Sequence, residues 1–190
     1  MVVQDNIYLE RYEDICDEIG RACVSIGVLN GIGTIGNEQL NYKDPRYKVI
    51  SLLCELTKRD LALTVWKIYL DTNSKANMVK SLNNYLKSKE INTNTKMRLS
   101  PEVKSITNDL SNIRKEYLAH LDYNTINHKL NMELTTKMYF EIVEMAKGLY
   151  RPDVDERVKP INDNCLHITM RDATIGTIMI IDELRMNDSD

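Results

Sequence analysis

Apolar residues recur at three- and four-residue steps along most of the chain, a spacing that predicts amphipathic helices. The predicted helices cover residues 7–28, 47–70, 76–86, 101–123 and 134–150. The clearest pattern is in the second of these, where the recurring apolar side chains are Leu52, Leu53, Leu56, Leu63, Trp66 and Leu70. We therefore expect an all-α fold, an antiparallel bundle of four to five helices.

Gly, Ser and Pro residues mark the predicted helix ends. A loop is predicted over residues 27–45, where four glycines follow one another closely: Gly27, Gly31, Gly33 and Gly36. This run is not a phosphate-binding loop, because no Gly-Lys-Ser or Gly-Lys-Thr sequence follows it. Residues 87–100 form a polar linker. Ser100 and Pro101 then predict a helix start, with Ser as the N-cap and Pro in the first turn.

After the last of these helices the helical pattern weakens. Residues 165–170 alternate as a short strand does. Asp172 is placed to cap a final helix that ends at Leu184, but the β-branched run ATIGTIMII favours a strand. We therefore expect a helical domain over residues 1–150 and a C-terminal extension, residues 151–190, packed on it.

The composition of the 190-residue chain is that of a soluble protein able to bury a core, with 43% hydrophobic and 28% charged residues. No apolar run approaches the roughly 18–20 residues that a membrane helix needs, so we expect no membrane association. The acidic N-terminal sequence lacks a basic stretch followed by an apolar core. We therefore predict no signal peptide and a cytoplasmic location.

The metal-ligating residue types are scattered. No Cys-x-x-Cys pair occurs among the cysteines, which are Cys16, Cys23, Cys54 and Cys165. We interpret all four as structural thiols. His128 and His167 have no paired carboxylate at a spacing typical of metal ligands. The sequence thus predicts neither a metal site nor a cofactor.

Charge is distributed unevenly along the chain. The formal net charge of −3 is not that of a protein built around nucleic acid. Residues 75–115, however, carry nine Lys or Arg against only Glu90, Glu102 and Asp109. This segment forms either a local basic surface or an ordinary solvated helix surface.

The helix predicted over residues 101–123 carries the one constellation with chemistry. At about 100° per residue, its apolar side chains form a single stripe: Ile106, Leu110, Ile113, Tyr117 and Leu121. Arg114 borders this stripe on one side and His120 borders it on the other. Glu116 lies four residues before His120, within reach to orient the imidazole.

Arg114 and His120 are the residue types that phosphodiester cleavage requires. The guanidinium offers a planar fork of donors matched to a phosphate. The imidazole takes and returns a proton near neutral pH. In RNA the 2′-hydroxyl is an internal nucleophile, and removing its proton lets it attack the adjacent phosphate without a metal.

Two segments also resemble a known family. LSNIRKEYLAHLDYN resembles the signature helix of the HEPN family, whose motif is an Arg, four to six residues and a His. RDLALTVWKIYLDTNSKANMVKSLNNYL is similar to the helix, turn and shorter helix found upstream in the abortive-infection branch. Together the blocks cover about residues 47–124.

The resemblance implies a HEPN-like bundle that dimerises, with two motif helices in one cleft. It implies a metal-independent endoribonuclease of a toxin or phage-defence system, in which Arg114 holds the phosphate and His120 is the general acid/base. The implied partners are an RNA substrate, a second copy of the chain, and a cognate antitoxin such as a nucleotidyltransferase-like protein.

The motif helix also departs from the family pattern. Lys115 follows the motif Arg, where the family most often has Asn, and Lys cannot accept a hydrogen bond as Asn does. Tyr123 resembles a tyrosine that some toxin relatives carry after the His, at a different spacing. The candidate substrate-binding residues on this helix are Lys115, Glu116, Tyr117 and Tyr123.

Two other interpretations stay open from the sequence. One is a non-catalytic HEPN-like module that binds nucleotide, RNA or a partner protein. The other is a structural bundle in which Arg114 and His120 satisfy buried polar groups. Trp66 and Asp60, on the predicted 47–70 helix, are interpreted as a core residue and a satisfied structural carboxylate.

Overall fold

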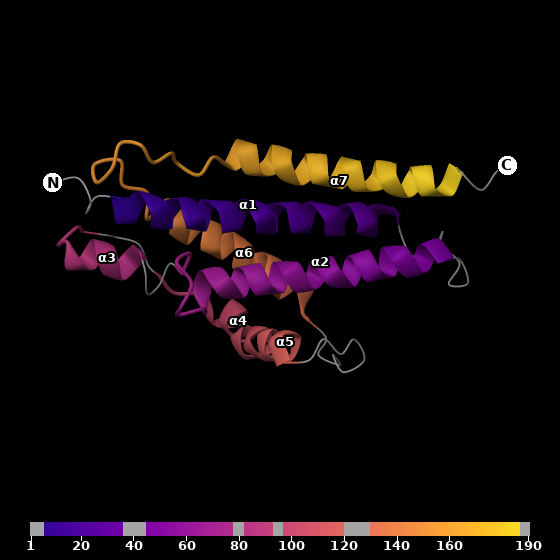
Figure 1. Ribbon diagram of the computed structural model, residues 1–190, viewed down its shortest axis with the longest axis horizontal. Helices are drawn as coiled ribbons and strands as arrows, with labels where there is room; N and C mark the ends of the chain where they lie inside the picture. Colours follow the sequence, from indigo (N-terminus) through magenta and orange to yellow (C-terminus); the bar gives the residue numbers. More distant parts are fainter. Residues whose placement is uncertain (1–5, 36–44, 78–81, 93–96, 120–129, 187–190) are drawn as a thin grey trace. The chain divides into compact units, whose positions relative to one another are not determined.

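The computed structural model describes residues 6–35, 45–77, 82–92, 97–119 and 130–186. All regular structure in these ranges is helical, which confirms the all-α prediction (Figure 1). The helices are α1 (Asn6–Ile35), α2 (Pro45–Tyr69), α3 (Asn83–Ser88), α4 (Pro101–Lys104), α5 (Thr107–Ala119), α6 (Met132–Lys147) and α7 (Asp163–Met186).

The predicted helices 47–70 and 134–150 are confirmed as α2 and α6. Asn131 caps α6, because its side-chain oxygen accepts a hydrogen bond from the Leu134 N–H at 3.0 Å. A shorter helix than the one predicted over residues 76–86 is present in the described part of the chain. This helix, α3, begins at Asn83 and ends at Ser88. These agreements rest on long apolar periodicity, which is the strongest sequence signal.

The predicted loop over residues 27–45 is wrong in its first part, because α1 continues to Ile35. Gly27 and Gly31 lie where α1 meets α7. A Cβ added to Gly27 would lie 2.7 Å from Ala173 Cβ, and one added to Gly31 would lie 2.7 Å from Thr177 Cβ. The glycines therefore permit close helix packing instead of ending the helix.

The predicted strand over residues 165–170 is also wrong, since these residues lie in α7. The two threonines of its β-branched run form hydrogen bonds from their hydroxyls to backbone carbonyls of the same helix. The hydroxyls of Thr174 and Thr177 lie 2.8 Å from the carbonyl oxygens of Met170 and Ala173, four residues earlier. Packing against α1 thus overrides the intrinsic β preference of the segment.

The chain divides into two compact units, each built from two stretches of sequence. Unit 1 comprises residues 1–19 and 62–161. Its core includes the fully buried rings of Tyr8, Tyr12 and Tyr139. The Tyr8 hydroxyl donates to the Leu149 carbonyl at 2.8 Å and accepts from the Arg151 N–H at 2.7 Å.

Unit 2 comprises residues 20–61 and 162–190. Its described part consists of the second half of α1, the first two thirds of α2, and α7. The Cys23 thiol lies 3.0 Å from the Leu166 carbonyl oxygen, and Arg46 Nη1 donates to the Leu184 carbonyl at 2.9 Å. In the part of the chain that the structure describes, no helix combines the length and apolarity that a membrane span requires.

The apolar pattern on α2 does not coincide with its buried face. Leu61, Val65 and Ile68 are fully buried. By contrast, Leu52, Leu53 and Leu56 retain 44%, 40% and 42% of their side-chain exposure. The regular leucine spacing therefore marks an exposed stripe in the first half of the helix.

Candidate functional site on helix α5

Helix α4 provides the start of the motif segment, as Ser100 and Pro101 predict. The Ser100 side chain accepts from the Val103 N–H at 3.5 Å, and Pro101 occupies the first turn. Glu141 of α6 fixes the start of α4. Its carboxylate accepts one hydrogen bond from the Ser100 N–H at 2.8 Å and another from the Ser100 hydroxyl at 2.6 Å. An ion pair between Lys137 and Glu102 adds a second tie to α6.

The single helix predicted over residues 101–123 is broken between α4 and α5 in the described part of the chain. Ser105 donates to the Glu102 carbonyl at 2.6 Å, and Thr107 donates to the Lys104 carbonyl at 2.9 Å. Such local side-chain bonds compete with regular helix hydrogen bonds. The hydroxyl-bearing residues at the junction thus explain a turn that apolar periodicity does not reveal.

The first part of the predicted apolar stripe is confirmed, and it runs from the turn before α5 into that helix. Ile106, Leu110 and Ile113 are buried, at 3%, 1% and 3% exposure. Burying this face fixes the rotation of α5 about its axis and therefore the direction of its neighbours. Arg114 follows the last of these three residues at the edge of the buried face.

Arg114 is half-buried and stacks on an aromatic ring of the same unit. Its guanidinium carbon lies 4.9 Å from the centroid of the Trp66 ring, within cation–π distance. Its Nε atom is buried and has no hydrogen-bond partner among the described residues. A buried donor without an acceptor costs free energy.

The sequence predicts Trp66 to be a core residue, but the structure shows it only partly buried. Its ring carries the Arg114 guanidinium. The contact with the Trp66 ring limits where the guanidinium can lie. Sequence reasoning missed this role, because the two residues lie far apart in the chain and no spacing rule connects them.

The remaining candidate residues differ in how far the structure describes them. Lys115 is exposed on α5. Glu116 and Tyr117 belong to α5, but their side chains lie outside the described part. His120 and Tyr123 also lie outside the described residues. Of the predicted pair Arg114 and His120, the structure therefore describes only Arg114.

Most of the cations described in the basic segment, residues 75–115, are exposed. Its exposed cations are Lys75, Lys87, Lys89, Arg98, Lys104 and Lys115. Lys75 forms an ion pair with Glu10. All these residues belong to unit 1, the unit that holds Arg114, so the interpretation as a local basic surface is compatible with the position of the site.

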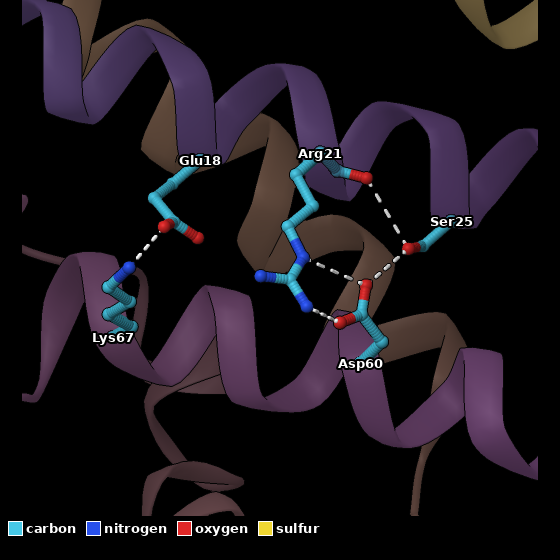
Figure 2. Close-up of polar contacts among 5 residues, drawn as sticks. All are labelled: Glu18, Arg21, Ser25, Asp60 and Lys67. Carbon is cyan, nitrogen blue, oxygen red and sulfur yellow. Dashed lines mark hydrogen bonds and ion pairs between the residues drawn. The ribbon is translucent and has the colours of Figure 1, made fainter.

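Two polar clusters join α1 to α2, one in each unit (Figure 2). In unit 1, Lys67 forms an ion pair with Glu18. In unit 2, the Asp60 carboxylate pairs with Arg21 and accepts a hydrogen bond from the Ser25 hydroxyl at 2.9 Å. Asp60 is therefore a satisfied structural carboxylate, as the sequence predicts.

An open groove of about 600 Å³ runs along α6 in unit 1, lined in part by Arg98 and by the half-exposed ring of Phe140. Two of its charged residues, Lys137 and Glu141, are the ones that hold α4. Side chains that line this groove therefore also hold the start of the motif segment in place.

The cysteines show no disulfide, although their environments differ. Cys23 is buried, Cys16 and Cys54 are partly buried, and Cys165 is exposed on α7. Burial raises the pKa of the Cys16 thiol to about 11, which keeps it protonated at neutral pH. Among the described residues, no group of three His, Cys, Asp or Glu side chains is placed to hold a metal ion.

Comparison with family models finds none that matches this chain, and searches of curated proteins and of solved structures likewise find no match.

Proposed function

We propose that this protein is a metal-independent endoribonuclease of the HEPN type, acting in a toxin or phage-defence system. The observation that carries the proposal is the position of Arg114, a half-buried guanidinium stacked on Trp66 with an unpaired buried Nε. Such a group is oriented before a ligand binds, which favours binding of a planar set of oxygen acceptors such as a phosphate.

The proposed reaction is a transesterification within RNA. His120 accepts the proton of the 2′-hydroxyl, and the 2′-oxygen attacks the adjacent phosphorus. The bond from phosphorus to the 5′-oxygen breaks, and that oxygen takes a proton from water as it leaves. Arg114 binds the non-bridging oxygens, whose negative charge grows during the attack. The products are a 2′,3′-cyclic phosphate and a 5′-hydroxyl end.

The proposal also includes the finer features that the family resemblance implies. These are a HEPN-like bundle of four to five helices, a homodimer with the motif helices in one cleft, and a cytoplasmic location. The proposed partners are RNA and a cognate antitoxin such as a nucleotidyltransferase-like protein. Lys115, exposed beside Arg114, is proposed to contact the RNA backbone.

Cleavage by purified protein tests this proposal. Arg114→Ala and His120→Ala should each lower the cleavage rate at least 100-fold, in line with the roughly 10²–10⁴-fold value of acid–base catalysis. Trp66→Leu should lower it less, because the charge remains and only its orientation is lost. Activity should persist in EDTA, since the nucleophile is part of the substrate.

Matched controls are available in the same chain. Arg98 is an exposed arginine of unit 1 and His167 is an exposed histidine of α7. Arg98→Ala and His167→Ala should therefore retain cleavage within a few-fold. Unchanged cleavage in Arg114→Ala would refute the proposal. RNA binding without cleavage by the wild type would instead identify a non-catalytic module.

A further inference from the structure

Arg114 and Trp66 meet between two helices of unit 1. Arg114 belongs to α5 and Trp66 to α2, and the guanidinium carbon lies over the indole ring, 4.9 Å from its centroid. Each of them follows a buried residue of its own helix. Trp66 comes after Val65, which is fully buried, and Arg114 comes after Ile113, which is 3% exposed. Both side chains are partly exposed, so they lie at the border between the core of unit 1 and its surface.

The buried Nε atom of Arg114 determines which side of the guanidinium a ligand can reach. Nε has almost no solvent exposure and has no hydrogen-bond partner among the described residues. A ligand that binds the guanidinium in its present position must therefore contact the terminal nitrogens, Nη1 and Nη2. These nitrogens carry most of the N–H donors of the group. A phosphate, with its non-bridging oxygens, is matched to such a pair of donors.

The indole ring limits how far these terminal nitrogens can move. An arginine side chain has many rotamers, and a ligand that immobilises it must offset the rotamer entropy that is lost. A cation over an aromatic face is attracted to it, and this attraction is stronger where water is partly excluded, as it is at this border. Part of the freedom of Arg114 is therefore lost on folding, before a ligand arrives.

We propose that Trp66 is the positioning residue of the Arg114 site, and that it affects phosphate binding only through the guanidinium that it carries. This inference rests on the proposed function, because it takes the ligand of Arg114 to be a phosphate of RNA. An aromatic side chain that stacks on bases would act with or without Arg114. The Trp66 ring is partly buried and carries the guanidinium, which leaves less of it for a base.

A double-mutant cycle separates these two roles. The probe is a fluorescein-labelled 2′-O-methyl oligoribonucleotide, whose blocked 2′-oxygen cannot attack, and its binding is followed by fluorescence anisotropy. Trp66→Leu should raise the dissociation constant about tenfold, within the range of measured cation–π energies. In an Arg114→Ala background, the addition of Trp66→Leu should change the dissociation constant by about twofold at most, because the group that Trp66 positions is absent.

A conservative variant and a matched control complete the cycle. Trp66→Phe keeps an aromatic face and should bind within about threefold of the wild type. Tyr85→Leu removes the ring that lies 5.9 Å from the Lys89 ammonium, a second cation–π contact of unit 1, and should leave the dissociation constant unchanged. Circular dichroism and urea denaturation establish that each variant is folded under the conditions of the binding assay.

The fluorescence of Trp66 gives a second, direct measurement. Trp66 is the only tryptophan of the chain, so selectively excited tryptophan emission reports on this ring alone. Inorganic phosphate has no base to stack, and it should change the emission of the wild type in a saturable way. Sodium chloride at equal ionic strength should not. Arg114→Ala should abolish the response, because the anion affects the ring only through the guanidinium.

Loss of binding in Trp66→Leu, recovery in Trp66→Phe and no further loss in the double variant would support the proposal. Equal losses from Trp66→Leu with and without Arg114 would overturn it, since the ring would then act on bases or on the fold. It would also be overturned by wild-type binding in Trp66→Leu, or by a wild type that binds neither probe.

Failure of the proposed ribonuclease activity is distinguishable from failure of this inference, because the binding measurements require no cleavage. A non-catalytic module that binds RNA through Arg114 would give the same cycle and the same emission response, and it would leave RNA intact. A ribonuclease in which Trp66 has no positioning role would cleave RNA, and Trp66→Leu would bind the oligonucleotide as the wild type does.

Discussion

Unit 1 and unit 2 bury their helices in different ways. Unit 1 surrounds large side chains such as Tyr8, Tyr12 and Tyr139 and ties the tyrosine hydroxyl of Tyr8 to the backbone. In unit 2, α7 approaches α1 over Gly27 and Gly31, where backbones come close and little side-chain volume lies between them. The apolar residues on the other faces of α2 and α7 then remain exposed.

This difference separates two kinds of surface. Unit 1 holds the half-buried Arg114 and the exposed cations of residues 75–115, the features on which the proposed RNA site rests. Most of the exposed large apolar side chains among the described residues lie in unit 2, mainly on α2 and α7. Substitutions at the close contacts of each unit measure whether the two units are stabilised as differently as their contacts indicate.

The largest expected effect is at the glycine contact of unit 2. In Gly27→Ala the new Cβ would clash with the Met170 carbonyl oxygen and lie 2.7 Å from Ala173 Cβ. Because the backbone of α7 must move, we expect a loss of about 2–3 kcal/mol in the free energy of unfolding. Urea denaturation followed by circular dichroism measures it.

Gly33→Ala is the control for this prediction, because nothing lies within 4 Å of a Cβ at that position of α1. Replacing a helical glycine by alanine there should stabilise the protein by about 0.5–1 kcal/mol. If both variants were stabilised alike, the close packing of α7 on Gly27 would be refuted.

The same glycines show why the sequence predicted only part of the fold. Long periodic segments such as α2 and α6 were predicted closely, since their signal is local. Gly27 and Gly31 were interpreted as a loop, because their role depends on α7, more than a hundred residues later. The strand predicted over residues 165–170 failed for the same reason: long-range packing outweighed local propensity.

The candidate site was predictable to a similar extent. The edge position of Arg114 follows from helical periodicity, and its half-buried guanidinium agrees with that expectation. Its stacking on Trp66 joins α5 to α2 and has no sequence signature. The break between α4 and α5 arises from the hydroxyls of Ser105 and Thr107, whose effect appears only with their backbone partners.

A smaller effect is expected at the tyrosine contact of unit 1. Tyr8→Phe removes a hydroxyl that bridges the Leu149 carbonyl and the Arg151 N–H. Leaving these two backbone groups without their partner should cost about 1–2 kcal/mol in the free energy of unfolding. Thermal and urea denaturation should both report this loss.

Tyr12→Phe provides the comparison, because the Tyr12 ring stacks on Tyr8 at 5.9 Å while its buried hydroxyl has no hydrogen-bond partner among the described residues. Removing that hydroxyl should be neutral or slightly stabilising. Equal losses in the two variants would mean that ring packing, and not the hydrogen bonds of Tyr8, stabilises this end of unit 1.

The smallest expected effect is the pH dependence of the turn after α6 in unit 1. The Asp155 carboxylate accepts from the Arg157 guanidinium at 2.7 and 2.9 Å and from the Arg157 N–H at 3.0 Å, which holds the pKa of Asp155 below its usual value. Because the pKa is lower in the folded state, the carboxylate stabilises the fold above the unfolded value of about 3.9. This contribution is lost as the pH falls through the folded pKa.

Asp155→Asn should therefore have a lower melting temperature than the wild type at pH 7, and the difference should shrink as the pH falls below about 4. Melting curves followed by circular dichroism from pH 7 to pH 3 measure this trend. Glu156→Gln, at an exposed neighbouring position, should match the wild type throughout. A difference for Asp155→Asn that stayed constant with pH would show that the turn depends on the shape of this side chain and not on its charge.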